Sequence, residues 1–530
     1  MASIPRSGIP RIIHQTWRDR RIPEGLGYPK SWIDSNPDWT YRFWTDEDLL
    51  AFFRTERPDL LDLYLAYPKG VQRADLARYC LLERYGGLYA DIDTRCVGSL
   101  EPIAGDHRVV LCEEPEAHWG PAIARGLPRL WFNGTMASPP GHPLWGRVIE
   151  LCRRMADRRD GDVLDNTGPL ILSAVVERWP DPNELALNGC ALFADIDAYG
   201  KPPSRAPWGP FGDRTISTHL WRGTWYETHQ ERWRARKIGR LRQMRDALFG
   251  GPRIDPAAAA AGIDAELLAR PIAASDGSAS VLVLLDLGAA GSDPERAFAL
   301  LAALDYPKDR LHIRLYGGGA AGGWTTPPGG SGGPFGSAAA LSGAAGRPRS
   351  RRAALREGRS KERNAALRAA LTAEHDWVLW LDASLLHYPP DTLRRLMAAQ
   401  AKIVVPHCVG RAGGPSLDRS TFLEVYRPTR AEFYEHVRSG VLRPPADWWY
   451  RRHLHDLRYL DRVPLHGVGA VMLLVDVSCH RAGLLFPELP YRHRAESEGF
   501  GLLARDLGIV PVGLPNLEVE RDPAPARTAP

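Results

Sequence analysis

The stretch RADLARYCLLERYGGLYADID, residues 73–93, decides how the surrounding chain folds. Its first half carries apolar residues at roughly helical spacing, and the double glycine at 86–87 ends that pattern. A short apolar strand then runs into Asp91 and Asp93. Alternate side chains of a strand share one face, so we expect both carboxylates to point the same way.

These two carboxylates predict a metal site. Two acids held so close repel each other unless a cation lies between them. Oxygen ligands suit a hard divalent ion, Mg²⁺ or Mn²⁺, and such ions commonly bridge to phosphate groups. An isolated Asp-x-Asp pair would be explained as well by a solvated strand end, but the residues upstream of this pair favour the metal.

Those upstream residues carry a resemblance. The stretch is similar to the sugar-nucleotide signature of glycosyltransferase family 32, the group of capsule-type sugar transferases and the fungal initiating α-mannosyltransferase. The matching residues are Arg73, Asp75, Arg78, Tyr79, Leu82, Gly86, Gly87, Tyr89, Asp91 and Asp93. The resemblance implies a GT-A fold, a nucleotide-sugar donor, catalysis supported by a metal on Asp91 and Asp93, and retention of anomeric configuration.

The first strand of the chain, within residues 9–17, also resembles this family. It ends with His14, Gln15 and Trp17, and ligands of open α/β sheets bind at such strand ends. We therefore expect a donor-facing edge, with simple packing of His14 and Trp17 as the open alternative.

The resemblance assigns further residues of the first half to the donor. They are Arg73, Asp75, Tyr89, Asn133 and Trp225. Asn133 precedes a glycine, so turn chemistry is its alternative explanation. Arg78 follows Asp75 by three residues and is equally well explained as its ion-pair partner.

His219 is the third metal ligand that the resemblance implies. A neutral imidazole beside two carboxylates makes a reasonable ligand set for Mn²⁺. A single histidine is usually not a ligand, but His219 lies just before aromatic residues at the end of the first domain.

The composition bounds the class of protein. A chain of 530 residues exceeds one ordinary core, so we expect more than one domain. The 44% hydrophobic and 25% charged residues fit a globular protein, and a formal charge of only +5 does not indicate a nucleic-acid partner. Seven cysteines without a C-x-x-C pair indicate reduced thiols. With neither a signal peptide nor a long apolar run in this sequence, we expect a cytoplasmic protein.

We expect an α/β protein with two tandem GT-A domains, which are Rossmann-like nucleotide-diphospho-sugar transferase folds. The predicted domains are residues 1–226 and 280–520, joined by a basic helix and linker at 227–279 and followed by a disordered tail at 521–530. The strongly basic segment 227–249 is either a solvated interdomain helix or a peripheral contact with anionic lipid at the inner face of the membrane.

The second predicted domain opens with a buried strand at 281–287 and contains a glycine-rich stretch at 317–346, for which we expect a loop. This half resembles glycosyltransferase family 62, that of the fungal mannan-polymerase subunits. The resemblance implies a GDP-mannose-like donor and gives donor-side roles to Arg363, Asn364, Asp382, Glu496 and Glu498. A charge pair at a helix N-terminus is the alternative for the two glutamates.

One departure from family 62 affects the metal. The family has Asp-Ala-Asp where this chain has Asp382-Ala383-Ser384, so one charged ligand is lost. We therefore expect this half to act without metal or only to bind.

Together these features predict a metal-dependent glycosyltransferase that moves mannose or a similar hexose from a GDP- or UDP-sugar to a glycan or lipid-linked acceptor. A carbohydrate-binding or scaffold protein made of degenerate transferase domains is the alternative. The intact acid pair at Asp91 and Asp93 argues against it.

Overall fold

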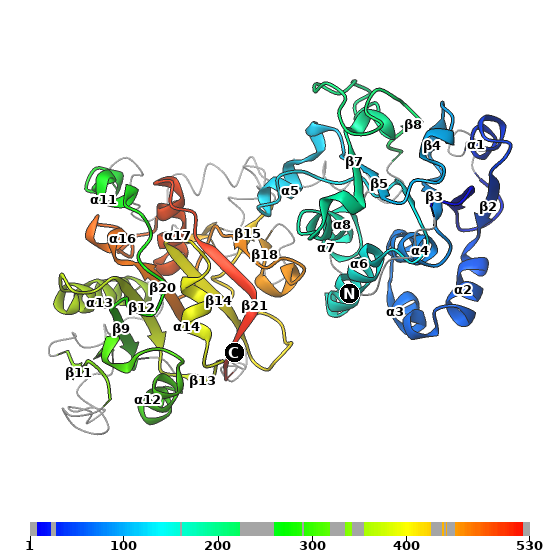
Figure 1. Ribbon diagram of the computed structural model, residues 1–530. Coiled ribbons are helices and arrows are strands. Elements are labelled where there is room, and N and C mark those ends of the chain that lie inside the picture. Colours follow the sequence, from blue (N-terminus) through cyan, green and yellow to red (C-terminus); the bar gives the residue numbers. More distant parts are fainter. Residues whose placement is uncertain are drawn as a thin grey trace. The chain divides into compact units, whose positions relative to one another are not determined.

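The computed structural model of the protein describes residues 8–22, 28–158, 162–222, 259–288, 291–317, 334–341, 354–425, 437–438, 441–442 and 451–522. The chain divides into two compact units, Met1–Glu227 and Thr228–Pro530. Both units contain a mixed β-sheet with helices packed on it (Figure 1). None of the helices in the described ranges is both long and apolar enough to cross a membrane.

A six-stranded sheet and a two-stranded ribbon form the first unit. The strands are β1 (Ile12–Thr16), β2 (Thr40–Trp44), β3 (Gly87–Ala90), β4 (Thr94–Cys96), β5 (Val109–Cys112), β6 (Thr135–Ser138), β7 (Leu185–Asn188) and β8 (Ser217–His219). The sheet has the order β2-β1-β3-β6-β5-β7. Strand β1 pairs in parallel with β2 and β3, whereas β6 runs antiparallel to β3 and β5. Strands β4 and β8 form the antiparallel ribbon.

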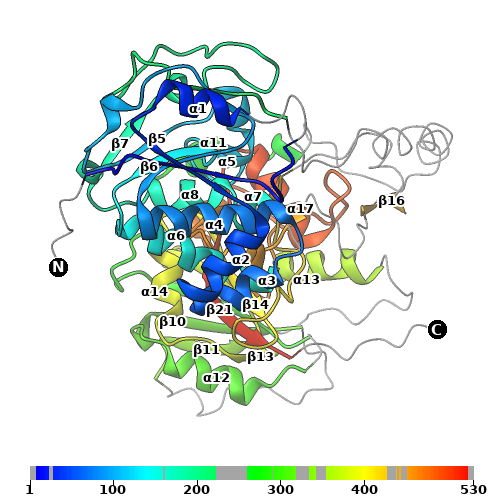
Figure 2. The ribbon, with the colours of Figure 1, turned by 90° about the vertical axis from the view of Figure 1, so that its right-hand side faces the viewer.

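Eight α-helices belong to the described part of the first unit. They are α1 (Pro29–Ser35), α2 (Asp46–Thr55), α3 (Leu61–Ala66), α4 (Gly70–Tyr85), α5 (Gly120–Ala124), α6 (Pro143–Arg154), α7 (Val163–Asn166) and α8 (Pro169–Val176). Helices α4, α6 and α8 lie side by side (Figure 2), and Tyr79 of α4 stacks on Trp145 of α6. A capping box starts α2, because Thr45 and Asp48 exchange hydrogen bonds of 3.0 and 3.1 Å.

The double glycine sets the sharp turn from α4 into β3. Gly86 and Gly87 have φ of 64° and 87°, a region that residues with a Cβ rarely adopt. A Cβ on Gly86 would lie 2.6 Å from the nitrogen of Pro140, and one on Gly87 would lie 2.4 Å from the carbonyl oxygen of Ile12. The chain can therefore make this turn only with glycine at both positions.

The second unit contains a nine-stranded sheet. Its strands are β9 (Val281–Asp286), β10 (Leu311–Tyr316), β11 (Ser337–Ala340), β12 (Trp377–Asp382), β13 (Leu385–His387), β14 (Ile403–Val409), β19 (Val463–Pro464), β20 (Met472–Asp476) and β21 (Val512–Arg521). The order is β11-β10-β9-β12-β20-β14-β21-β13, and β19 pairs with β21. Strands β9, β10, β11 and β12 run parallel to one another, and β20 runs antiparallel to β12 and β14.

Helices and short ribbons complete this unit. The helices are α11 (Ala265–Ala269), α12 (Pro294–Ala303), α13 (Ala354–Ala370), α14 (Thr392–Met397), α16 (Val477–Arg481) and α17 (Glu496–Asp506). The short strands are β15 (Leu423–Glu424), β16 (Val437–Arg438), β17 (Val441–Leu442) and β18 (Arg451–Arg452).

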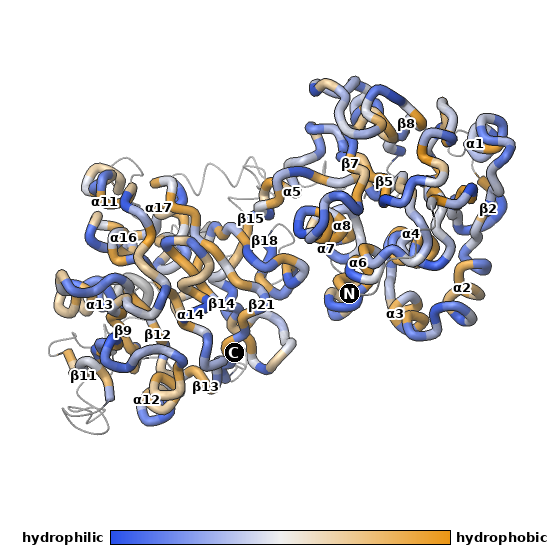
Figure 3. Tube along the Cα trace, viewed as in Figure 1, coloured by the Kyte–Doolittle hydropathy of each residue, from blue (hydrophilic) through white to orange (hydrophobic). Residues whose placement is uncertain are grey.

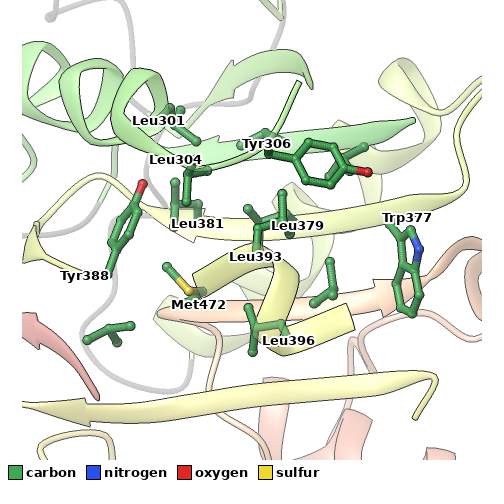
Figure 4. Packing of buried hydrophobic residues seen from close by; sticks show 14 of the residues in the cluster. Leu301, Leu304, Tyr306, Trp377, Leu379, Leu381, Tyr388, Leu393, Leu396 and Met472 are labelled. Atoms are coloured by element: carbon green, nitrogen blue, oxygen red, sulfur yellow. The ribbon is translucent and has the colours of Figure 1, made fainter. Parts of the chain in front are cut away.

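The core of the second unit lies between the sheet and the helices α12 and α14. Leu379 of β12, Leu301 of α12 and Leu396 of α14 belong to one buried cluster (Figure 4). Strands β9 and β12 are buried along their whole length, as their continuous apolar sequence predicts, and both carry the hydrophobic colour of Figure 3. This burial fixes the strand ends that carry Asp286 and Asp382.

Three predicted segment boundaries need correction. Residues 337–340 of the predicted glycine-rich loop form β11, because their backbone pairs with β10 despite a composition without large apolar residues. The predicted linker 227–279 contains residues that belong to the second unit, since the amide of Asp264 donates to the carbonyl of Ala482. The predicted tail begins one residue too early, because Arg521 is the last residue of β21. The basic segment 227–249 lies outside the described residues.

Candidate metal centre

Three side chains converge at the end of β3. Asp91 directly follows this strand, Asp93 precedes β4, and His219 ends β8. The imidazole Nε2 of His219 lies 3.1 Å from Oδ1 of Asp93 and 4.0 Å from Oδ2 of Asp91. One ligand atom from each residue lies within 4.8 Å of the others, the only such set of three found in the described ranges. Two carboxylates and an imidazole form a donor set that fits Mn²⁺ or Mg²⁺.

The two acids converge through a turn, so the expectation that both extend from one strand is wrong. Strand β3 ends at Ala90, and the carbonyl oxygen of Asp91 accepts hydrogen bonds from the amide of Thr94 (3.1 Å) and from its hydroxyl (2.5 Å). A threonine side chain can replace the ladder of a sheet in this way. The turn then feeds into β4, where Thr94 pairs with His219.

The buried guanidinium of Arg78 neutralises the carboxylate of Asp91. Its Nη2 lies 3.0 Å from Oδ1 of Asp91 and 3.2 Å from Oδ1 of Asp75. The side chain of Arg78 is only 5% exposed. Burial raises the pKa of Asp91, and the guanidinium of Arg78 opposes this rise. The predicted pairing of Arg78 with Asp75 is confirmed, but the same arginine also holds the first acid of the metal set.

His219 holds Asp93 in its charged form. Burial acts most strongly and would raise the pKa of Asp93, but the hydrogen bond and charge of His219 and the backbone amide of Arg222 together lower it. The amide of Trp221 donates to Nδ1 of His219 at 3.3 Å, which places the ring proton on Nε2. A cation on Nε2 requires that proton on Nδ1, so binding must break the contact with the Trp221 amide.

A buried polar network lies behind the metal set. Oδ1 of Asp75 accepts a hydrogen bond from the side-chain amide of Asn133 (3.1 Å), and Oδ2 accepts one from the hydroxyl of Thr167 (2.9 Å). Burial raises the pKa of Asp75 to about 6. The backbone carbonyl of Asn133 accepts a hydrogen bond from Arg78 at 2.7 Å. Asn133 therefore connects Asp75 to the arginine that contacts Asp91.

Two predicted donor residues hold Asp91 in place. The side-chain amide of Gln15 donates to the carbonyl of Asp91 at 3.0 Å, and the hydroxyl of Tyr89 donates to its Oδ1 at 3.0 Å. Thr16, which the sequence analysis did not single out, lies 3.0 Å from the Tyr89 hydroxyl. Because the Tyr89 proton goes to Asp91, Thr16 must be the donor to Tyr89.

Two predicted donor residues are engaged elsewhere. His14 is fully buried, accepts a hydrogen bond from Trp44 at Nδ1 (3.1 Å) and donates from Nε2 to the carbonyl of Gly86 (3.0 Å). Burial lowers the pKa of His14 to about 4, which favours the packing alternative. Arg73 donates to the carbonyl of Tyr67 at 2.9 Å.

Two tryptophans, Trp17 and Trp225, were also predicted to contact the donor. The indole nitrogen of Trp17 is buried and has no hydrogen-bond partner among the described residues. Trp225 lies outside those residues. Trp221 was not predicted, but its ring packs against His219 with centroids 4.3 Å apart, and it donates to the carbonyl of Ile196.

The predicted donor residues of the second unit form separate contacts. Arg363 pairs with Glu496 and lies 3.8 Å from Asp286. Asn364 is buried and exchanges two hydrogen bonds with the backbone of Phe486, which gives it a structural task. Asp286 was missed, although an acid at the end of a buried parallel strand is a signal that sequence analysis can use.

Asp382 and the two glutamates complete this set. Oδ1 of Asp382 accepts from the amide of Ser384 at 2.9 Å. Glu496 and Glu498 lie in the first turn of α17, where the helix dipole favours acids. Glu498 also lies 3.2 Å from Nη2 of Arg451, so both glutamates have a guanidinium partner.

Each half of the chain matches one family model. Residues 24–110 match the family model of a glycosyltransferase sugar-binding region containing a DXD motif, and residues 345–422 match the Anp1 family model. Inositol phosphoceramide mannosyltransferase 3 of Schizosaccharomyces pombe is 36% identical over 177 residues, which cover 33% of this chain and 46% of the relative. The mannan polymerase complex subunit mnn9 of the same organism is 31% identical over 158 residues, covering 28% of this chain and 46% of the relative.

The chain spans about half the length of these curated relatives. Among solved structures, a mannosyltransferase from Pyrobaculum calidifontis in complex with GDP-Man and Mn²⁺ aligns with 14% identity and a TM-score of 0.27, covering 56% of this chain and 69% of that one. This overlap is too small to establish a common fold. The relatives named here are mannosyltransferases and a mannan polymerase subunit.

Proposed function

We propose that the protein is a metal-dependent glycosyltransferase that moves mannose or a similar hexose from a GDP- or UDP-sugar to a glycan or lipid-linked acceptor. In this proposal the first unit is a family 32-type GT-A domain and the second unit a family 62-type one. The observation that carries the proposal is the convergence of Asp91, Asp93 and His219. The similarity to mannosyltransferases supports the choice of sugar.

Each residue of the first unit has a distinct task in this proposal. Asp91, Asp93 and His219 would hold the cation, which supplies positive charge beside the leaving diphosphate. Arg78, Gln15 and Tyr89 are positioning residues, because they fix both the backbone and the carboxylate of Asp91.

Retention of configuration is part of the same proposal. Attack of the acceptor on the face that the diphosphate leaves requires no enzymatic nucleophile. The buried carboxylate of Asp75 is occupied by Arg78, Asn133 and Thr167, so we assign it to the organisation of the centre and not to attack on the sugar.

The test is donor turnover by the full chain. GDP-mannose and a panel of GDP- and UDP-hexoses are incubated with the protein in Mn²⁺ or in EDTA, and the released nucleotide is measured. We expect release in Mn²⁺, none in EDTA, and a loss in Asp93→Asn. The matched control is Asp62→Asn, an exposed acid on α3 away from the centre, and it should behave as the parent.

The same experiment separates the enzyme from its alternative. A carbohydrate-binding or scaffold protein leaves every donor intact in both buffers. Full release from Asp93→Asn would also overturn the proposal, because the cation would then be held without the second acid.

The location is a further part of the proposal. We place the protein in the cytoplasm, with the basic segment 227–249 as a contact to anionic lipid at the inner face of the membrane. The seven arginine and lysine residues between 232 and 245 support this contact, because such a cluster is attracted to anionic headgroups. Sedimentation with vesicles that contain or lack phosphatidylserine tests it, and equal binding to both would refute it.

A further inference from the structure

Two acids end neighbouring parallel strands of the second unit. Asp286 of β9 and Asp382 of β12 are partners in the strand register, at the edge where open α/β sheets bind ligands. One oxygen of each accepts a backbone hydrogen bond, Asp286 from Gly288 (2.8 Å) and Asp382 from Ser384 (2.9 Å). The other oxygen of each carboxylate remains for a positively charged partner.

Guanidinium groups supply that charge. Nη2 of Arg363 lies 3.8 Å from Oδ2 of Asp286, and Nη1 of Arg521 lies 3.6 Å from Oδ2 of Asp382. Side-chain exposures of 12% and 9% for the two acids mean that neither charge is screened well by water. Each of the two acids therefore has a guanidinium within 4.0 Å, that of Arg363 being shared with Glu496, and this positive charge offsets their repulsion without a divalent ion.

The local residue types also disfavour a metal. Ser384 stands at the second acidic position of the motif, and a neutral hydroxyl is a weaker ligand for a hard cation than a carboxylate. No group of three acidic, histidine or cysteine ligand atoms converges here within the described residues.

Arg521 is the arginine with donors to spare. Arg363 is nearly buried, pairs with Glu496 and lies over the ring of Phe486. The side chain of Arg521 is 25% exposed, and its guanidinium makes no hydrogen bond to a described residue, because Asp382 lies beyond hydrogen-bond distance. A guanidinium carries five N–H donors in a planar fork that matches phosphate oxygens.

A second unsatisfied donor lies two residues after Asp382. Ser384 is 2% exposed, and its hydroxyl has no hydrogen-bond partner among the described residues. The next residue, Leu385, is the register partner of Arg521 across β13 and β21. Ser384 and Arg521 also share the carboxylate of Asp382, which accepts from the Ser384 amide at 2.9 Å and lies 3.6 Å from the Arg521 guanidinium.

We infer that the second unit binds the diphosphate of a nucleoside diphosphate without a metal ion, with Arg521 and Ser384 donating hydrogen bonds to its oxygens. The guanidinium of Arg521 takes the place that a cation would occupy beside Asp382. This site is independent of the metal centre in the first unit.

Calorimetry on the full chain in EDTA tests the inference, because chelation removes the metal that the first unit needs. The probes are GDP, GMP, inorganic pyrophosphate and a short polyprenyl diphosphate. We expect GDP to bind more tightly than the other three, and Arg521→Gln to weaken GDP binding about 10- to 100-fold, the range for a charged hydrogen bond. Arg310→Gln, an exposed arginine of the same unit, is the control and should bind as the parent.

Further variants separate charge, folding and location. Arg521→Lys keeps the charge without the fork and should lose less affinity than Arg521→Gln, while thermal unfolding checks that both variants fold. Asp93→Asn should leave GDP binding in EDTA unchanged. Absence of GDP binding in EDTA, unchanged binding in Arg521→Gln, or loss of binding in Asp93→Asn would each overturn the inference. Tighter binding of the polyprenyl diphosphate would overturn the nucleotide assignment.

Discussion

Both units bring two acids together where strands end, but the arrangement and the charge balance differ: Asp91 and Asp93 lie in a turn after β3, whereas Asp286 and Asp382 end neighbouring parallel strands. In the first unit, Asp91 and Asp93 face His219, and a single arginine, Arg78, contacts only the first acid. In the second unit, Asp286 and Asp382 each have an arginine. If the proposed metal site is correct, the partners across the fold, more than the spacing of the acids, decide whether a divalent ion is required.

The largest expected effect concerns the cation itself. Replacing Asp91→Asn removes one charged ligand, so Mn²⁺ affinity of the full chain should fall on the order of 1000-fold. Titration of Mn²⁺ followed by electron paramagnetic resonance measures this. The corresponding change Asp382→Asn should leave Mn²⁺ affinity as in the parent, and a loss there would mean that the two units hold cations alike.

Removal of the shared arginine should give the next largest effect. Arg78→Met leaves the buried carboxylates of Asp75 and Asp91 without their guanidinium, which we expect to lower the free energy of unfolding by about 3–5 kcal/mol. Urea unfolding followed by tryptophan fluorescence measures the loss. Adding Asp75→Asn to this variant should restore part of the stability, and a double variant no more stable than Arg78→Met would contradict the ion-pair account.

A feature that the units share predicts a similar acid response in both. His14 in the first unit and His480 in the second each accept a hydrogen bond from a tryptophan and donate to a backbone carbonyl. Burial lowers the pKa of each to about 4. Since the folded pKa lies below the unfolded value, the stabilisation is present above about pH 6.5 and is lost as the pH falls toward 4.

Each histidine should contribute about 3 kcal/mol to this loss. Unfolding measured at several pH values, with His14→Gln and His480→Gln compared with the parent, tests it. Each variant should show a shallower fall in stability between pH 6.5 and 4. A parent-like slope in either one would show that its histidine is protonated in the folded protein at higher pH.

The smallest expected effect comes from converting one site toward the other. Ser384→Asp combined with Arg521→Gln supplies the missing acid and removes the competing guanidinium. The second unit should then bind Mn²⁺ about tenfold more tightly than the second unit of the parent does, and still more weakly than the first unit does. Mn²⁺ stoichiometry in the Asp93→Asn background reads out this site alone. An unchanged stoichiometry would mean that the geometry at β12, and not the charge, excludes the ion.

Local patterns predicted the elements that carry the first site, but not their long-range partners. Helical spacing and the double glycine located α4 and β3. The turn after Asp91 depends on the hydroxyl of Thr94, a local choice that alternation along a strand does not reveal. His14 is part of the buried core because it hydrogen-bonds to Trp44 and to the carbonyl of Gly86, which are distant in sequence.

The second unit shows the same limit. Strands β9 and β12 follow directly from their apolar runs, whereas β11 was missed because Ser and Ala residues pair through their backbone alone. Arg521 stands 139 residues after Asp382 in the sequence, and the pairing of β21 with β13 and β14 brings the two together. A serine in the motif indicated the loss of a ligand, but it did not indicate the arginine that lies 3.6 Å from Asp382.

The turn at Gly86 and Gly87 has a consequence for how such enzymes diverge. No side chain fits at either position, so the length of the connection between helix and strand is fixed. One residue inserted between Gly87 and Asp91 would turn the side chain of Asp91 toward the opposite face of the sheet. Metal binding can thus disappear through a length change that leaves every ligand intact. In comparing distant homologues, the spacing from this glycine pair to the acids is therefore a better guide to a working centre than the acids themselves.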